Sequence, residues 1–434
     1  MDPAARPAVD RLLARHRADA DGDQLCPPLH QAAHGAGVGL GAAAVGVAQV
    51  GVGSVRPRWR RSRCGRCGRR APRYDRQAER RWQHLSYGVA RTELVYAPWR
   101  VRCPHCRAVV VEAVPWARHR SRFTRPFEEM VAYLAQITHR TAVTELMGIA
   151  WVTVGAILTR VVDERLDPKR FQGLRHIGVD EFSYRKRHRY LTVVVDHDRR
   201  RVVWAHEGRS SATLKLFFDL LGPEGRASIE VVTMDMAGGY IKAVREALPQ
   251  AEIVFDRFHV QQLASRALDE IRRRLQRTQR GTPEGKALFH TRFALLKNAS
   301  HLTRRDRERL ALVEKHNRKL YRAYLLKEAL AQALSFKAPW RVERALKRWL
   351  AWASRSRLPP FVRVARTLRK HLPGILAYAR TRLTNAFVEG LNNRTRVIAR
   401  RAFGFHSPRP LIASIYLCEG GIRLDPPLPR PTKG

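Results

Sequence analysis

The sequence is poor in acidic residues. Its 434 residues include 38 Asp and Glu against 82 Lys and Arg, a formal net charge of +44. The excess is spread along the whole chain and is richer in Arg than in Lys, so nucleic acid is the favoured partner. A ribosomal or chromatin-like basic protein is the alternative, but a hydrophobic content of 44% and strongly patterned segments favour a folded enzyme.

Long apolar runs are nearly absent. His34–Val55 lacks charged side chains and is long enough to raise the question of a membrane span. It consists mostly of Ala, Gly and Val, so its transfer into lipid would be poor, and it begins too far along the chain for an ordinary signal peptide. We therefore expect no membrane partner, and we interpret residues 1–57 as a poorly ordered leader or a single marginal β segment without an assigned function.

Cysteine is also scarce, with residues at positions 26, 64, 67, 103, 106 and 418. The middle four form two C-x-x-C pairs, Cys64 with Cys67 and Cys103 with Cys106. Such spacing indicates metal binding more often than a disulfide, and four thiolates are the full ligand set of a structural zinc ion. His84 and His105 are competing ligands. We predict a zinc-binding module over residues 58–120 that serves folding and DNA contact, in a reducing cytoplasm.

The next segment, residues 121–168, has apolar residues at helical spacing. Gly148 stands where two short helices would turn, which predicts a helix-turn-helix whose second helix, from about Trp151, enters the major groove of DNA. The apolar residues expected to bury its inner face are Val143, Met147, Ile149, Val154 and Ile157. An ordinary helical hairpin would show the same spacing.

Residues 174–260 alternate strand and helix signals in the order β-β-β-α-β-α-β. This is the order of the ribonuclease-H-like fold, so we expect the first part of a catalytic core here. Residues 261–380 show only helical patterns and are interpreted as an all-helical insertion. A last helix, from about Asn385 to Arg401, completes the core within residues 381–424, and residues 425–434 form a Pro-rich tail that we expect to be disordered.

Three acidic residues stand at positions suited to metal binding. Asp180 lies on the first strand of the predicted sheet, where alternation turns its neighbour Glu181 to the opposite face. Asp235 closes the apolar run Val231–Met234, and active sites of α/β sheets gather at such strand ends. Glu389 lies on the last helix and shares one face with a set of polar residues: Asn385, Asn393 and Arg396.

Phosphodiester cleavage and transfer need this type of set. Two Mg²⁺ or Mn²⁺ ions can activate the attacking oxygen and stabilise the leaving one, and carboxylate oxygens are the ligands that Mg²⁺ prefers. A small acidic island within an Arg-rich chain suits an enzyme that holds DNA and metal together. Taken singly, each acid is more often a helix cap or a surface charge.

The sequence resembles the ISL3 family of bacterial insertion-sequence transposases, within the DDE group. The resemblance runs from about Tyr96 to Leu417. It is carried by these blocks: VRCPHC at 101–106, VPWARHRSRFT at 114–124, IGVDEFSYRKRHRYLTVVVD at 177–196, VTMDMAGGY at 232–240, FDRFHV at 255–260 and NAFVEGLNNRTRVIARRAFGF at 385–405. Asp180, Asp235 and Glu389 match the family's catalytic acids. Asp256 and His259 look like an auxiliary D-x-x-H motif, although a helix cap and a satisfied histidine would give the same pattern.

The resemblance implies an enzyme that binds the terminal inverted repeats of an insertion sequence, hydrolyses a strand at each end, and joins the freed 3′-hydroxyl to target DNA. It implies a nucleoid-associated bacterial protein that acts on double-stranded DNA as a homodimer or higher oligomer. Two alternatives stay open, namely a DNA-binding regulator derived from an inactive transposase, and a metal-dependent nuclease without joining activity. Residues 1–57 depart from the family pattern.

Overall fold

The computed structural model separates into two compact units, residues 1–170 with 400–434, and residues 171–399. The structure describes residues 50–59, 61–185, 189–236, 238–282, 285, 288–383, 386–401 and 407–427. Most of the predicted leader, residues 1–49, and the end of the predicted tail lie outside these ranges. The units are described one at a time.

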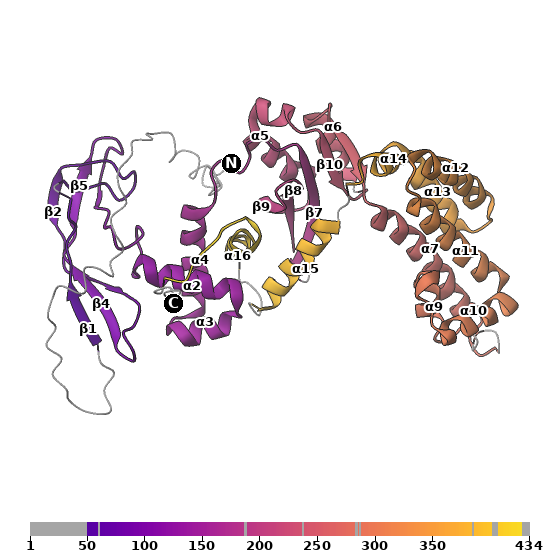
Figure 1. The fold of residues 1–434 in the computed structure, drawn as a ribbon, viewed down its shortest axis with the longest axis horizontal. Coiled ribbons are helices and arrows are strands. Elements are labelled where there is room, and N and C mark those ends of the chain that lie inside the picture. The colour runs from indigo at the N-terminus through magenta and orange to yellow at the C-terminus, as the bar shows by residue number, and fades with distance from the viewer. Residues whose placement is uncertain are drawn as a thin grey trace, which may run out of the picture. The chain divides into compact units, whose positions relative to one another are not determined.

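The first unit begins with two small sheets (Figure 1). One has the order β1-β4-β3, with β1 Val50–Ser54, β4 Arg91–Tyr96 and β3 Arg80–Gln83. The other has the order β2-β5-β6, with β2 Arg73–Arg76, β5 Trp99–Cys103 and β6 Ala108–Val111. β1 pairs with β4 in parallel, so a β segment, one of the two alternatives given for residues 1–57, is present at Val50–Ser54.

Three helices follow: α2 Arg125–Ile137, α3 Arg140–Met147 and α4 Trp151–Arg165. α3 ends at Gly148, whose left-handed backbone (φ 60°) allows the tight turn predicted there. Val143, Val154 and Ile157 are fully buried as predicted, whereas Met147 and Ile149 are only half-buried. The predicted helix-turn-helix is therefore formed.

α16 (Pro408–Glu419) packs against α4 and α2 in the same unit. Gly155 of α4 permits this contact, because a Cβ there would lie 2.6 Å from the Arg140 guanidinium and 3.2 Å from Pro410. Gln136 of α2 donates to the carbonyl of Leu417 at 2.7 Å. The sequence placed residues 381–424 together in the catalytic core, but the structure joins α16 to the helix-turn-helix.

No single helix in the described ranges is long and apolar enough to cross a bilayer. The pair α3 and α4 passes that test by length and composition only when joined, and it is bent by 98°.

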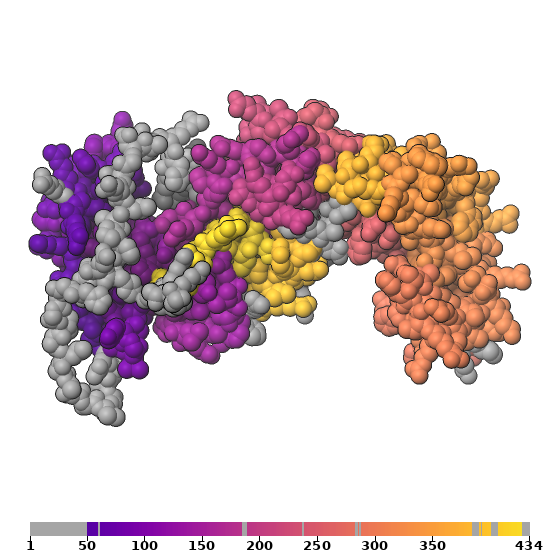
Figure 2. Space-filling model, viewed as in Figure 1, coloured from indigo at the N-terminus to yellow at the C-terminus, as the bar shows by residue number. Residues whose placement is uncertain are grey.

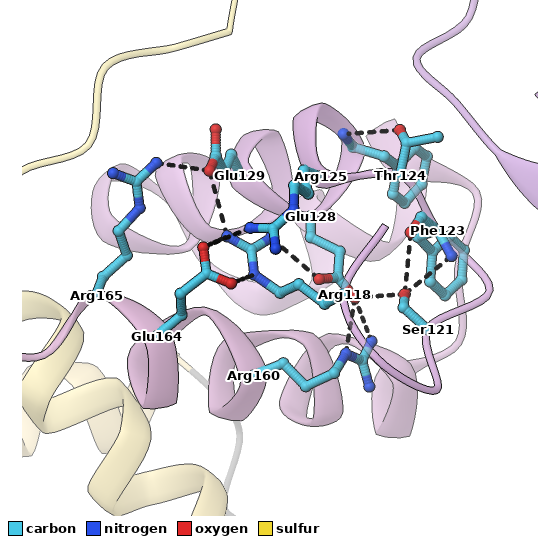
Figure 3. A network of polar contacts seen from close by, with 11 residues as sticks. Arg118, Ser121, Phe123, Thr124, Arg125, Glu128, Glu129, Arg160, Glu164 and Arg165 are labelled. Carbon is cyan, nitrogen blue, oxygen red and sulfur yellow. Dashed lines mark hydrogen bonds and ion pairs between the residues drawn. The ribbon is translucent and has the colours of Figure 1, made fainter. Parts of the chain in front are cut away.

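A buried ion network ties the loop before α2 to the helices (Figure 3). The Glu128 carboxylate is fully buried and accepts hydrogen bonds from Arg118 at 3.1 Å, Ser121 at 2.7 Å and Arg160 at 2.8 Å. Arg118, itself buried, also pairs with Glu129 and Glu164. Because Arg118 lies in the loop, Glu128 on α2 and Arg160 on α4, the network joins all three segments.

The second unit holds a five-stranded sheet of order β11-β10-β7-β8-β9. Its elements follow the predicted order: β7 His176–Arg185, β8 Arg189–Asp196, β9 Arg201–Glu207, α5 Ser211–Ala227, β10 Val231–Met234, α6 Gly238–Ala247 and β11 Glu252–Phe255. β7, β8 and β9 form an antiparallel meander, and β10 and β11 run parallel to β7. Trp204, Phe217 and Tyr240 are buried between the sheet and the pair α5 and α6.

Helices make up the described residues from 257 to 383, as predicted for the insertion (Figure 2, salmon to orange). They are α7 Arg257–Thr278, α9 Arg292–Leu296, α10 Arg304–His316, α11 Arg318–Ser335, α12 Pro339–Arg355, α13 Pro359–Lys370 and α14 Leu372–Thr381, with a 3₁₀ turn at Ala299–His301. α14 packs on the edge strand β11, where Gly374 leaves room for Phe255. α15 (Ala386–Arg401) follows.

Replacing Glu128 by Gln is expected to destabilise the first unit by about 3 to 5 kcal/mol, because the buried Arg118 and the half-buried Arg160 would lose their shared carboxylate. Chemical denaturation of the full chain, followed by circular dichroism, measures this loss. Glu145→Gln removes the same charge from an exposed position on α3 and should change stability by less than about 0.5 kcal/mol. Equal effects of the two substitutions would contradict the role assigned to the network.

Candidate functional site

The pairing of β7 with β10 brings two acidic residues together. Gly178 of β7 is opposite Thr233 of β10 in a parallel register. Asp180 lies two residues after Gly178 on β7, and Asp235 lies two residues after Thr233, just past the end of β10. Both side chains are half-buried, and the charge of Asp235 raises the pKa of Asp180. The structure thus brings together the two acids that the sequence placed at the sheet.

Asp180 is held in an environment that disfavours its negative charge. Burial is the largest cause that raises its pKa to about 6, and Asp235 adds to the rise. The Glu181 backbone N–H donates to the Asp180 carboxylate at 2.7 Å, and the charges of His259 and Arg396 act in the same lowering direction. These groups offset the effect of burial on the pKa of Asp180 only in part, so added positive charge would favour the ionised form of Asp180.

Two of the auxiliary residues lie at the start of α7. Asp256 is the N-cap of this helix and accepts from the Phe258 N–H at 3.3 Å. His259 Nδ1 lies 3.8 Å from Asp256 Oδ2, which is too long for a hydrogen bond but close enough for an ion pair. Asp256 is the largest cause that raises the pKa of His259, and Asp180 and Asp235 raise it further. Asp256 therefore has the capping role, while the imidazole faces three carboxylates.

The last helix contributes at the same place. Arg396 on α15 lowers the pKa of Asp180, and it donates to Asn393 Oδ1 at 2.6 Å. Glu389 belongs to α15 by its backbone, but its side chain lies outside the described part of the structure. Asn385 also lies outside it. The placement of the third acid therefore stays a prediction.

Glu181 was set aside by the sequence reasoning, because alternation turns it away from Asp180. It pairs with Thr192, whose hydroxyl is 2.8 Å from the Tyr240 hydroxyl. Burial raises the pKa of Glu181, and Asp235 is the next cause. Asp235 lies just past the end of its strand, so its charge reaches acids on both faces of β7. The alternation of side chains along β7 alone does not predict that Asp235 raises the pKa of Glu181.

The four predicted zinc ligands converge in the first unit. Their sulfur atoms all lie within 4.8 Å of one another. Cys64 Sγ is 3.8 Å from Cys106 Sγ, and Cys67 Sγ is 3.6 Å from Cys103 Sγ. The described cysteines form no disulfide. This cluster can hold a metal ion.

Backbone groups around the cluster favour thiolates. The Arg66 N–H points to Cys64 Sγ and the Cys106 N–H to Cys103 Sγ, each at 3.4 Å. Burial raises the pKa of Cys103. Hydrogen bonds from the Cys106 N–H and from neighbouring thiols outweigh this effect and lower the pKa of Cys103 to about 7.

The two histidines weighed as competing ligands have other partners. His84 Nδ1 is hydrogen-bonded to Thr124 at 2.8 Å, and His105 Nδ1 lies 3.3 Å from Arg69. Among the described residues, the metal-binding group consists of the four cysteines.

Comparison with known proteins identifies the family that this sequence matches. A family model described as a transposase, of the ISL3 type, matches residues 177–415, and a model of the helix-turn-helix domain of ISL3 transposases matches residues 112–162. The transposase for insertion sequence element IS1557 of Mycobacterium tuberculosis is 44% identical over 393 residues, which cover 85% of this chain and 87% of that protein. The transposase for insertion sequence element IS1001 of Bordetella parapertussis is 30% identical over 344 residues, 79% of this chain and 85% of that protein.

Asp180→Asn is expected to stabilise the metal-free protein at pH 8. The pKa of Asp180 is about 6 in the folded chain, above the value of about 3.9 for an unfolded chain. The folded state therefore binds this proton more tightly, and the associated stability is lost as the pH rises from 4 through 6. The amide avoids an ionisation cost on the order of 1 to 3 kcal/mol.

Thermal unfolding in EDTA should show Asp180→Asn melting a few degrees above the unsubstituted chain at pH 8 and near it at pH 4. Asp219→Asn, at an exposed position on α5, is the matched control and should show no difference. If Asp180→Asn were not more stable at pH 8, the inferred cost of ionising Asp180 in the folded chain would be wrong.

Proposed function

This chain belongs to the ISL3 family of insertion-sequence transposases, and we propose that it cuts the ends of its element and joins them to target DNA with a three-carboxylate active site. The single observation that carries the proposal is the convergence of Asp180 and Asp235 on adjacent parallel strands beside Arg396 of α15. Glu389 is seven residues before Arg396 on that helix, two turns away on the same face. We propose it as the third acid.

We further propose that residues 174–260 and α15 form a ribonuclease-H-like core that the helical segment interrupts. The support is topological. The central strand β7 is flanked by an antiparallel meander on one side and by two parallel strands on the other. Helix α15 comes late in the chain, yet its Arg396 is close enough to lower the pKa of Asp180.

The first unit would bind the ends of the element. α4 is the helix that would lie in the major groove, and the cysteine cluster would hold a structural zinc ion. Tetrahedral ligation at a Zn–S distance of about 2.3 Å places sulfur atoms about 3.8 Å apart. The separations of two sulfur pairs, 3.8 and 3.6 Å, fit that geometry, and all four sulfur atoms lie within 4.8 Å of one another.

At the active site, the crowded carboxylates fit divalent cations better than they fit solvent, because burial and mutual repulsion both disfavour their charge. Bound Mg²⁺ or Mn²⁺, in a pair, would polarise the scissile phosphate and stabilise the leaving 3′ oxygen. Asp180, Asp235 and Glu389 would hold these ions. Arg396 would face a phosphate oxygen, and His259, whose pKa is raised, would keep positive charge beside the acids.

Two reactions follow from this arrangement. In the first, a water oxygen forms a bond to phosphorus, loses a proton to solvent, and the bond to the 3′ oxygen breaks. In the second, the freed 3′-hydroxyl oxygen forms a bond to a phosphorus of target DNA and loses its proton to solvent. The bond from that phosphorus to the 3′ oxygen of the target strand breaks, and this oxygen takes up a proton and leaves as a 3′-hydroxyl. A nuclease without joining activity would share the first reaction alone, and a regulator derived from an inactive transposase would show neither.

We expect about one zinc ion per chain, released by the double substitution Cys103→Ser with Cys106→Ser. Removing half of the thiolates leaves the ion with too few ligands, and folding of the small sheets should weaken with it. Elemental analysis of the purified chain measures the zinc. Cys418→Ser, outside the cluster, should retain the full content. Unchanged zinc in the double variant would refute the assignment.

Glu389→Gln is expected to lower nicking and strand transfer by about a hundredfold or more, because it removes a charge from the metal-dependent step while it keeps the side-chain shape. Nicking of a labelled end duplex in Mg²⁺ measures the loss, and gel-shift binding of the same duplex in EDTA should stay near normal. Glu224→Gln, an exposed carboxylate at the end of α5, is the matched control. Near-normal nicking by Glu389→Gln would remove this residue from the triad.

A further inference from the structure

Helix α12 has two faces of opposite character. Its inner face is buried in the helical segment and consists of Val342, Leu346, Trp349, Leu350 and Ala353. On this face the Trp349 indole donates to the Leu326 carbonyl at 2.8 Å. The opposite face, here named the Trp/Arg face, consists of Trp340, Arg344, Arg348, Trp352 and Arg355.

The spacing of these residues makes the Trp/Arg face continuous. Trp340, Arg344, Arg348 and Trp352 follow one another at intervals of four, so they form a row along one side of the helix. Trp340 is 59% exposed and Trp352 is 39% exposed. Two indoles therefore flank a row of guanidinium groups, whereas the third tryptophan of the helix is in the core.

The surroundings of the Trp/Arg face are strongly basic. The described stretch 336–383, which contains α12, α13 and α14, has thirteen Lys and Arg and a single carboxylate, Glu343. Glu343 is already paired with Lys347 at 2.7 Å. Arg344 and Arg348 form no ion pair with any described residue. Such an excess of exposed positive charge favours an anionic partner.

We propose that the Trp/Arg face binds DNA, with its arginines on backbone phosphates and its tryptophans stacked on unpaired bases. The proposal rests on the proposed function in taking DNA as the substrate. Exposed Trp and Arg also occur at protein interfaces. The near absence of carboxylates over three neighbouring helices favours a polyanion as the partner. Single-stranded DNA fits both kinds of residue, since its phosphates can bind Arg and its bases can stack on Trp.

The arginines are tested by the salt dependence of binding. The full chain carrying Arg344→Gln and Arg348→Gln is titrated in EDTA with a duplex of random sequence and with the same duplex containing a single-stranded gap. Each lost phosphate contact removes about 0.7 to 0.9 from the slope of log affinity against log salt, so a decrease of roughly 1.5 is expected. Arg305→Gln with Arg307→Gln removes equal charge from α10, where acids are interleaved, and should leave the slope unchanged.

The tryptophans are tested by the same titrations. Trp340→Ala with Trp352→Ala should weaken binding of the gapped duplex by about tenfold and that of the intact duplex much less. Phe293→Ala, which removes a 67% exposed ring from α9, is the control. Circular dichroism confirms that each variant is folded.

Equal slopes and affinities for the Trp/Arg variants and their controls would overturn the proposal. Unchanged DNA affinity with altered sedimentation of the Trp variant would also overturn it, since the face would then join copies of the chain. Both outcomes are distinct from failure of the proposed function, which would appear as absence of nicking and strand transfer by the unsubstituted chain in Mg²⁺.

Discussion

The like-charge pair of Asp180 and Asp235, at β7 and the end of β10, is the constraint on which the catalytic unit depends. Parallel pairing of β7 with β10 brings Asp180 close to Asp235. The two carboxylates repel each other, and burial further disfavours the charge of Asp180. Nearby positive charge stabilises such a pair. Arg396 and His259 supply some of it from two different helices, and a bound divalent cation would supply the rest.

This constraint explains why the chain brings distant segments to one point. Asp180, Asp235, His259 and Arg396 come from β7, the end of β10, the start of α7 and α15. The helical segment, α7 to α14, lies between β11 and α15 in sequence and packs on the outer strand β11 through α14. It can therefore be inserted without breaking the sheet, because it follows the last strand β11 and packs back on that strand through α14.

Much of this organisation could be predicted from local patterns. The alternation of strand and helix signals gave the order of residues 174–260, and apolar spacing with Gly148 gave the helix-turn-helix, since both depend on periodicity within one segment. The convergence of the cysteines followed from two short motifs with fixed chemistry. The association of α16 with α4 was missed, because it depends on the fit of Pro410 over Gly155, which no local period encodes. The effect of Asp235 on Glu181 was missed for a similar reason, since it arises where one strand ends beside another.

The first unit solves a different problem, which is to make small sheets rigid with little core. Its two sheets bury only short clusters, one around Val101 and the cysteines and one around Trp82, Leu94 and Trp116. Such clusters exclude too little water to hold strands of four to six residues in place. A zinc ion held by the four cysteines would clamp one end, and the Arg118–Glu128 network clamps the other to α2 and α4. Because both clamps are polar and depend on geometry, they set the orientation of the loop that leads into the helix-turn-helix, and with it the direction from which α4 would meet DNA.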